Sequence, residues 1–287
     1  MNKSKATAAF VSSLCIYGTI GWALAYVSLP NETVVLFRGA IGTAFILVVL
    51  LLTKRRIDLP SVRDNLLWLA AGGLSLGFNW VFLFSAYRVT TVAVACLCNY
   101  MGPVIFIFVA PIILKEKRSL KKIVCALVAV GGMVLVSGVV KGGAEGVTAE
   151  GICLGLGAAM FFVTLLLANK KLGEIPVLER SVVQLAFATL PALPFVLVNG
   201  ICQTFTPDAL SIGLVVMLGI VHTGLAYCLY FGGLSGLSGQ TAAVLGYVEP
   251  AVAVLVSTLI LHEPLSVFGW VGAILIIGAA AISEIVE

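Results

Sequence analysis

Charged side chains are scarce in this sequence. Asp, Glu, Lys and Arg together make up 10% of its 287 residues, against 61% hydrophobic residues, whereas an average soluble domain carries about 25% charged residues. A soluble fold of this size could not cover so much apolar surface with polar groups. The scarcity of charge therefore excludes a soluble enzyme, an extracellular disulfide scaffold and a disordered chain, and it leaves a polytopic membrane protein.

The sequence also lacks the signatures of bound metals, nucleotides and disulfides. Its seven cysteines form no Cys-x-x-Cys pair or Cys/His cluster, and it has neither a phosphate-binding glycine loop nor a His-Glu-x-x-His zinc motif. We interpret the cysteines as small apolar residues. The net charge of +4 resides mostly in short loops and does not indicate binding to nucleic acid. We expect no enzyme activity, no cofactor and no metal.

Long apolar runs are what the sequence has in place of charge. A transmembrane β-barrel would show strands of about ten alternating residues, but these runs are apolar on all sides and about 20 residues long, which is the length of a spanning helix. The sequence predicts an all-α membrane protein. Its ten expected transmembrane helices cover residues 8–28, 33–53, 66–87, 91–114, 120–140, 151–169, 177–199, 210–233, 240–261 and 266–285.

The basic residues of the loops predict the orientation. With the N-terminus inside, thirteen Lys and Arg residues fall on the cytoplasmic side, and only Arg88 and Lys141 fall outside. Cytoplasmic loops are the ones enriched in Lys and Arg. We therefore expect a multi-pass protein whose N- and C-termini both lie in the cytoplasm.

An internal repeat divides the chain into two halves. A shift of 147 positions superposes residues 91–139 on 238–286 without a gap, and a shift of 142 superposes Arg38 on Arg180. The first shift pairs Tyr100 with Tyr247, Pro103 with Pro250, Glu116 with Glu263, Gly72 with Gly219, Ser75 with His222, Trp80 with Tyr227 and Gly131 with Gly278. We therefore predict two five-helix repeats, 1–140 and 141–287.

Each half contains an odd number of spans, so the two repeats must enter the membrane from opposite sides. The loop 115–122 is strongly basic, whereas its counterpart 262–269 has no Lys or Arg, as expected if the first loop is cytoplasmic and the second is not. Inverted repeats are the architecture that lets one central site face either side of a membrane.

Two short motifs connect this architecture to a known family. Tyr247-Val248-Glu249-Pro250-Ala251, followed by Leu261-His262-Glu263-Pro264-Leu265 and a glycine-rich last span, resembles the EamA-type family of the drug/metabolite transporter superfamily. The resemblance covers nearly the whole chain. It implies a ten-helix bundle in a prokaryotic inner membrane, with a central cavity lined by spans 1, 3, 4, 6, 8 and 9. It also implies transport of amino acids or other small organic metabolites, often outward.

Glu249 is the first candidate site residue, because no other acidic residue lies deep within an expected span. A charge at that depth costs about 2.5–3.5 kcal/mol on insertion scales, so such a residue normally faces a cavity or a partner. We expect it to bind a cationic group or a proton. A neutral carboxyl bonded to a neighbouring helix is the alternative.

Helix breaks and a histidine are further candidates. Pro103 and Pro250 remove helical hydrogen bonds near the middle of two related spans, and broken helices at the midplane indicate transporter sites. His222 lies in the middle of the eighth span. It would relay a proton or bind a carboxylate, or else bond to a nearby hydroxyl or carbonyl.

Aromatic and amide side chains complete the predicted cavity wall, since they offer stacking, cation–π contact and hydrogen bonds. The residues concerned are Tyr17, Trp22, Asn79, Trp80, Asn99, Tyr100, Tyr227, Tyr230 and Tyr247. Arg38 and Arg180 lie one to two turns inside the second and seventh expected spans. We expect them to extend to the lipid headgroups, with carboxylate binding as the alternative.

Two other functions compete with transport. Residues 233–239 contain two Gly-x-Ser-Gly sequences like those of intramembrane serine proteases, but Ser235 lies thirteen residues from His222, about 20 Å along a helix. A scaffold or receptor would not explain a buried acid. We therefore expect a secondary transporter of a small amphipathic metabolite, most simply an amino acid, with membrane lipid around it. Proton coupling and the oligomeric state stay open.

Overall fold

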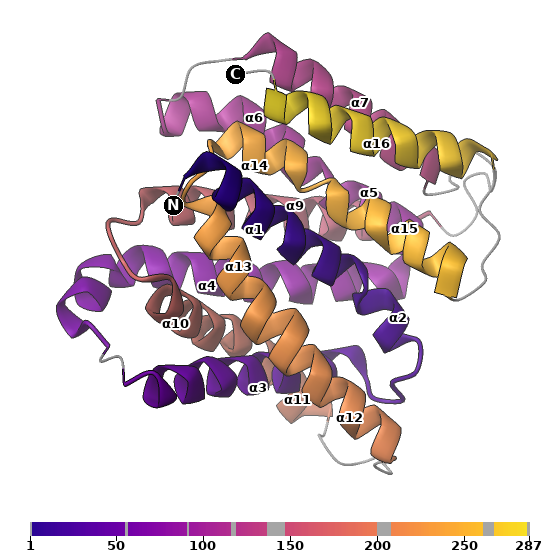
Figure 1. Cartoon of the computed structure of the whole chain (residues 1–287). Helices are drawn as coiled ribbons and strands as arrows, with labels where there is room; N and C mark the ends of the chain where they lie inside the picture. The colour runs from indigo at the N-terminus through magenta and orange to yellow at the C-terminus, as the bar shows by residue number, and fades with distance from the viewer. Residues whose placement is uncertain are drawn as a thin grey trace.

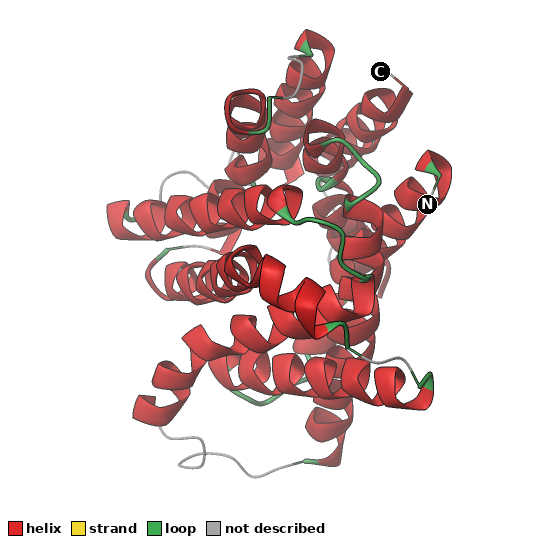
Figure 2. Ribbon diagram, turned by 90° about the vertical axis from the view of Figure 1, so that its left-hand side faces the viewer, coloured by secondary structure: helices red, strands yellow, loops and turns green. Residues whose placement is uncertain are grey.

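A computed structural model describes residues 2–54, 57–90, 92–115, 119–136, 147–199, 208–260 and 267–285. Glu116 and Glu263, which the repeat pairs, lie outside these residues. The described residues are helical, with short turns and no strand among them (Figure 2). The all-helical prediction is therefore confirmed.

Among the described residues, the first half forms five spans from seven helices, which Figure 1 shows in order along the chain. These helices are α1 (Lys3–Gly18) with α2 (Ile20–Leu24), α3 (Asn31–Leu52), α4 (Leu59–Val89), α5 (Val92–Asn99) with α6 (Met101–Ile113), and α7 (Leu120–Val136).

The second half repeats this order. Its segments are α9 (Ala149–Lys171), α10 (Val177–Thr189) with η1 (Leu190–Ala192) and α11 (Leu193–Asn199), α12 (Ala209–Met217) with η2 (Leu218–Leu225) and α13 (Ala226–Leu234), α14 (Gly239–Leu245) with α15 (Val248–Ile260), and α16 (Val267–Ile285). Each segment or group falls on one expected span. Within the described residues, seven stretches are long and apolar enough to cross a membrane; α7, α14–α15 and α16 are the spans outside that set.

Side-chain caps fix where several spans begin. Asp58, Thr148 and Asp208 each accept a hydrogen bond from the backbone N–H three residues later, at the starts of α4, α9 and α12. Such a cap satisfies one of the N–H groups that a helix start leaves free. Hydrogen bonds from Ser211, and then from the hydroxyl of Ser28, also hold the pKa of the Asp208 carboxyl below its ordinary value.

The fourth and ninth spans are interrupted at equivalent places. The fourth span is broken at Tyr100, and Pro103 is the third residue of the helix that follows. The ninth span is broken at Gly246 and Tyr247, and Pro250 is the third residue of the helix that follows. Proline is tolerated in a first turn, because the N–H that it lacks has no helical acceptor there. The prolines therefore begin new helices in the middle of both spans.

The packing follows the pseudo-twofold relation of the repeats. α7 and α16 lie side by side at one edge of the bundle (Figure 1). Gly72 of α4 lies against Gln184 of α10, and its repeat partner Gly219 lies against Ile41 of α3. Helix pairs that the sequence relates thus approach each other through equivalent glycines, where a missing Cβ permits close contact. With five spans in each half, α9 enters the bundle from the side opposite α1.

Candidate functional site

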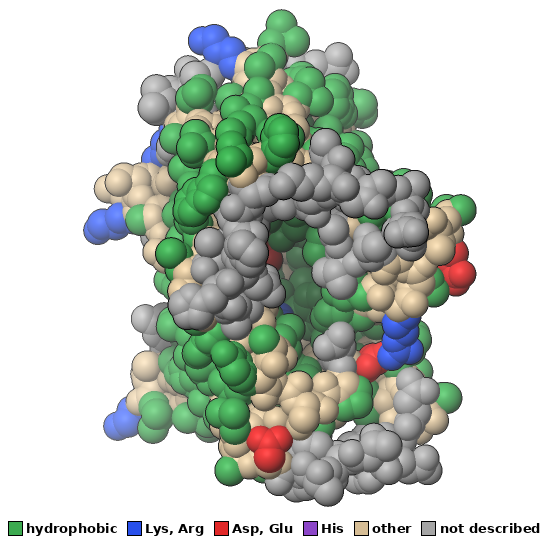
Figure 3. Space-filling view, turned by 90° about the vertical axis from the view of Figure 1, so that its right-hand side faces the viewer, with side chains coloured by type: hydrophobic (Ala, Val, Ile, Leu, Met, Phe, Trp, Pro, Cys, Tyr) green, Lys and Arg blue, Asp and Glu red, His purple; other side chains and the backbone are tan. Residues whose placement is uncertain are grey.

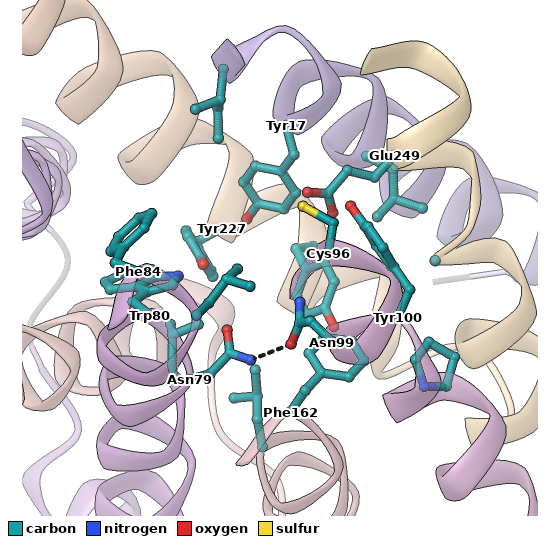
Figure 4. A pocket seen from close by; sticks show the side chains of 18 of the residues that line it. Tyr17, Asn79, Trp80, Phe84, Cys96, Asn99, Tyr100, Phe162, Tyr227 and Glu249 are labelled. Carbon is teal, nitrogen blue, oxygen red and sulfur yellow. Dashed lines mark hydrogen bonds between the residues drawn. The ribbon is translucent and has the colours of Figure 1, made fainter. Parts of the chain in front are cut away.

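A cavity of about 200 Å³ lies at the centre of the bundle, between the two halves (Figure 4). The first half contributes lining residues from α1, α3, α4, α5 and α6, and the second half contributes them from α9, α13, α14 and α15. Its polar and aromatic lining residues are Phe10, Tyr17, Arg38, Asn79, Trp80, Phe84, Tyr87, Cys96, Asn99, Tyr100, Phe162, Tyr227, Tyr230 and Glu249. The cavity is therefore built across the repeat boundary rather than within one repeat.

Aromatic rings form one wall of this cavity. The ring of Tyr227 lies 5.2 Å from that of Tyr17 and 6.3 Å from that of Trp80, measured between centroids. The hydroxyl groups of Tyr17 and Tyr230 are buried and have no hydrogen-bond partner. Since an unpaired buried hydroxyl is unfavourable, these groups are suited to bind a polar solute.

Two asparagines of the first half line another part of the cavity, and one of them bonds to the second half. The amide nitrogen of Asn79 donates to the side-chain oxygen of Asn99 and to the backbone carbonyl of Ala158, each at 2.8 Å. Asn99 is the last residue of α5, directly before the helix break. The hydrogen bonds of Asn79 therefore hold the broken fourth span against α4 and α9, and they fix this side of the cavity.

Glu249 lies in the first turn of α15 and is half-buried. Figure 4 shows its carboxyl group inside the cavity, toward Tyr17 and Tyr100. Its backbone N–H donates to the carbonyl of Gly246 at 3.3 Å, one of the acceptors that Pro250 would leave free. The helix break thus places the acid at the cavity, as expected from the sequence, and no salt bridge joins it to Arg38, the cation of the same cavity.

Arg38 is placed differently from the prediction. Its side chain is only 6% exposed and lines the cavity, with its Cζ 4.8 Å from the centre of the Trp80 ring. Arg180 is also buried, with its Cζ 5.0 Å from the centre of the Phe231 ring. The expectation that both extend to the headgroups is wrong, because both face the bundle interior, where aromatic faces stabilise the guanidinium groups.

Three predicted site residues lie outside the cavity lining. His222 is buried in the π-helical segment η2, and its Nε2 lies 2.8 Å from the hydroxyl of Thr19, at the break between α1 and α2. Trp22 packs edge-on against Tyr26. Tyr247 is fully buried, and its hydroxyl donates to the carbonyl of Tyr100 at 2.7 Å. His222 and Tyr247 thus hold interrupted helices together.

The residues that suggested a protease do not form a dyad. The hydroxyl of Ser235 is exposed and donates to the carbonyl of Gly232 at 2.8 Å, whereas His222 bonds to Thr19. Ser238 caps α14. Among the described residues, no group of three or more His, Cys, Asp and Glu side chains could hold a metal ion.

Several cavity residues were not expected from the sequence. Phe84 and Tyr87 of α4, Cys96 of α5 and Phe162 of α9 all line it. These residue types are common in any membrane helix, and the hydropathy pattern does not say which face of a helix points inward. The thiol of Cys96 lies 3.1 Å from the hydroxyl of Tyr87, so the pair forms a weakly polar patch on the wall.

The two ends of the cavity differ. At the end near the start of α1, a Cβ added to Gly233 of α13 would lie 2.7 Å from the carbonyl oxygen of Ala6, and the ammonium of Lys170 donates to the carbonyls of Leu234 and Leu237. At the other end, the face that Figure 3 shows is hollowed near its centre. In the described conformation α1 and α13 are therefore in close contact at one end of the bundle, whereas the face at the other end is hollowed.

Comparison with known proteins agrees with this architecture. The family model described as "EamA-like transporter family" matches residues 5–138 and again 149–284. An uncharacterized transporter of Bacillus subtilis, YxxF, is 26% identical over 98% of the chain and 90% of its own length. Protein PecM of Dickeya dadantii is 29% identical over 83% of the chain and 78% of its own length.

The overall arrangement of the helices also has a solved counterpart. One crystal structure superposes with a TM-score of 0.83 and covers 98% of both chains, at 22% sequence identity. At this identity the likeness concerns the fold alone.

Proposed function

Because the chain belongs to the EamA-like transporter family, we propose that it is a secondary transporter that exports a small amphipathic metabolite of the amino-acid class. The observation that carries this proposal is the cavity, since both repeats contribute to it and it holds the acid Glu249. A site between inverted repeats can face either side of the membrane when one half rocks against the other. The sequence has no nucleotide-binding motif, so an ion gradient or the substrate's own gradient would supply the energy.

The distribution of Lys and Arg supports one orientation of the bundle. The helices α3 and α9 end at the end of the bundle where α1 begins (Figure 1). Lys170 and Lys171 are the last two residues of α9, and Lys54 follows α3, so the positive-inside rule assigns that end to the cytoplasm. Both termini are then cytoplasmic, and the hollowed face in Figure 3 is external. In this orientation the described conformation faces outward, with α1 and α13 in close contact on the cytoplasmic side.

Glu249 has the role of a shared binding group in this proposal. Its carboxylate takes either the ammonium group of the substrate or a proton, so that binding of one excludes the other. Competition for one buried acid would couple outward movement of substrate to inward movement of protons. The other titratable side chains that line the same cavity are Arg38, Tyr17, Tyr87, Cys96, Tyr100, Tyr227 and Tyr230.

Transport by purified protein in liposomes tests the proposal, with labelled standard amino acids as probes. We expect saturable counterflow of at least one amino acid by the wild type, with a rate that changes between pH 5 and 8. Glu249→Gln keeps the size of the side chain and removes its charge, and we expect it to lose substrate–proton coupling and at least about tenfold in rate. Glu150→Gln, at an exposed glutamate in the first turn of α9, is the matched control.

Two outcomes would contradict the proposal. If Glu249→Gln transports as well as the wild type over the whole pH range, the assigned role of the acid is wrong. If the wild type moves none of the amino acids, the substrate class is wrong.

A further inference from the structure

Arg38 has an unused hydrogen-bond donor inside the cavity. Its side chain is 94% buried, since only 6% is exposed, and its Nε has no hydrogen-bond partner. Trp80 lies against the guanidinium face at 4.8 Å. This contact holds the group in place, and the Nε–H, one of the donors with which arginine binds carboxylates, has no partner.

The repeat supplies an internal comparison in Arg180, the counterpart of Arg38. The Nε of Arg180 donates to the side-chain oxygen of Asn169 at 2.9 Å, and a second nitrogen donates to the carbonyl of Phe231 at 3.4 Å. Arg180 does not line the cavity. Each arginine thus has one buried nitrogen without a partner, Nη2 in Arg180 and Nε in Arg38. The difference is that the Nε of Arg180 is bonded to the protein, whereas Arg38 lines the cavity with its Nε unpaired.

Arg38 and Glu249 face the same space without neutralising each other. Both line the cavity, and no salt bridge joins them. Buried charges are retained when something pairs with them. A solute that carries a carboxylate and an ammonium group would pair with both at once.

We propose that Arg38 binds the carboxylate of a zwitterionic substrate whose ammonium group binds Glu249 and whose apolar side chain lies against Trp80 and Tyr227. This inference rests on the proposed transport function and makes Arg38 the residue that selects amino acids over simple amines. The cavity of about 200 Å³ has the volume of about seven water molecules at about 30 Å³ each, which suits one solute of amino-acid size.

Three related probes test which charged group of a ligand is recognised. Phenylalanine carries both groups, phenethylamine lacks the carboxylate, and 3-phenylpropionate lacks the amine, while all three keep the same ring. A bound ligand raises the melting temperature of purified protein by mass action, so titration of each probe gives its dissociation constant. For the wild type we expect phenylalanine to bind at least about tenfold more tightly than either truncated probe.

Variants of the two arginines test which of them causes the preference for phenylalanine. We expect Arg38→Gln to lose the preference of phenylalanine over phenethylamine, because the partner of the carboxylate is gone. Arg38→Lys keeps the charge without the planar fork, and we expect it to keep part of the preference. Arg180→Gln is the matched control: it should lower the melting temperature of the free protein and keep the preference.

The experiment distinguishes failure of the role of Arg38 from failure of the proposed substrate class. If phenethylamine binds the wild type as tightly as phenylalanine, or if Arg38→Gln keeps the full preference, the role of Arg38 is overturned while transport of a cation survives. If neither the probes nor any standard amino acid stabilises the wild type, the inference and the proposed substrate class both fall. Should Arg38→Gln not fold, the comparison of the three probes on the wild type decides the matter.

Discussion

At the scale of single residues, Tyr100 and Tyr247 occupy equivalent repeat positions but have different structural roles. Tyr100 lines the cavity, whereas Tyr247 is fully buried and donates a hydrogen bond of 2.7 Å to the carbonyl of Tyr100. This bond joins the two helix breaks across the pseudo-twofold relation. The internal repeat predicts that the two residues are equivalent in position, but not which of them faces the cavity.

Removal of the Tyr247 hydroxyl should therefore act on stability. Tyr247→Phe leaves the carbonyl of Tyr100 without this partner in a buried place, at a cost of about 1–3 kcal/mol, so we expect a lower melting temperature in detergent. Tyr26→Phe, at a tyrosine that is 51% exposed, is the control and should leave the melting temperature unchanged. Equal melting temperatures for the wild type and Tyr247→Phe would show that the bond contributes nothing.

Residue type alone predicts part of the cavity lining, while the binding of a substrate by these residues stays a prediction. Glu249, Asn79, Asn99 and Trp80 were found because each is polar or aromatic within an apolar run, and all line the cavity. Arg38 was assigned wrongly, because its long side chain near the start of a span fits either the headgroups or the interior. The choice depends on which face of α3 meets α4, and only the packed bundle shows that.

At the scale of helices, hydropathy predicts the number and approximate positions of the spans, but not all of their ends or interruptions. The helix α4 begins at Leu59, where Asp58 caps it, although the sequence predicts a start at residue 66. Prolines predicted the breaks in the fourth and ninth spans. The π-helical segment Leu218–Leu225 was not predicted, since apolar composition reports the length of a helix and not its hydrogen-bond register. Within this segment the side-chain hydroxyl of Thr223 donates to the carbonyl of Leu218 at 3.0 Å.

Glycine contacts between helices give a matched test at this scale. A Cβ added to Gly73 of α4 would lie 2.5 Å from the carbonyl oxygen of Gln184 in α10, whereas one added to Gly131 of α7 would meet nothing within 4 Å. We expect Gly73→Ala to force the helices apart, at about 1–3 kcal/mol, and to lower the melting temperature. Gly131→Ala should leave it unchanged or raise it, because alanine favours a helix by about 1 kcal/mol. A melting temperature that is higher for Gly73→Ala than for Gly131→Ala would contradict the packing described.

At the scale of the whole molecule, two inverted halves and the space between them explain the fold. The long apolar runs predict ten spans, and the internal repeat divides them into two halves of five. The odd number in each half predicts that the halves run in opposite directions. The cavity could be expected at the interface of the halves. The close approach of α1 and α13 at one end of the bundle could not be predicted, because it depends on contacts such as Gly233 against Ala6, which belong to one conformation.

Alternating access of the central cavity can be measured without knowledge of the substrate. Cys96 lines the cavity and would be kept as the sole cysteine, and a membrane-impermeant thiol reagent would be applied to right-side-out and to inside-out vesicles. In a second variant without Cys96, a cysteine at Asp64, exposed near the start of α4, reports one side alone. We predict that Cys96 is modified in both kinds of vesicle, while the cysteine at residue 64 is modified only in inside-out vesicles. Modification of Cys96 from one side alone, or from neither, would contradict it.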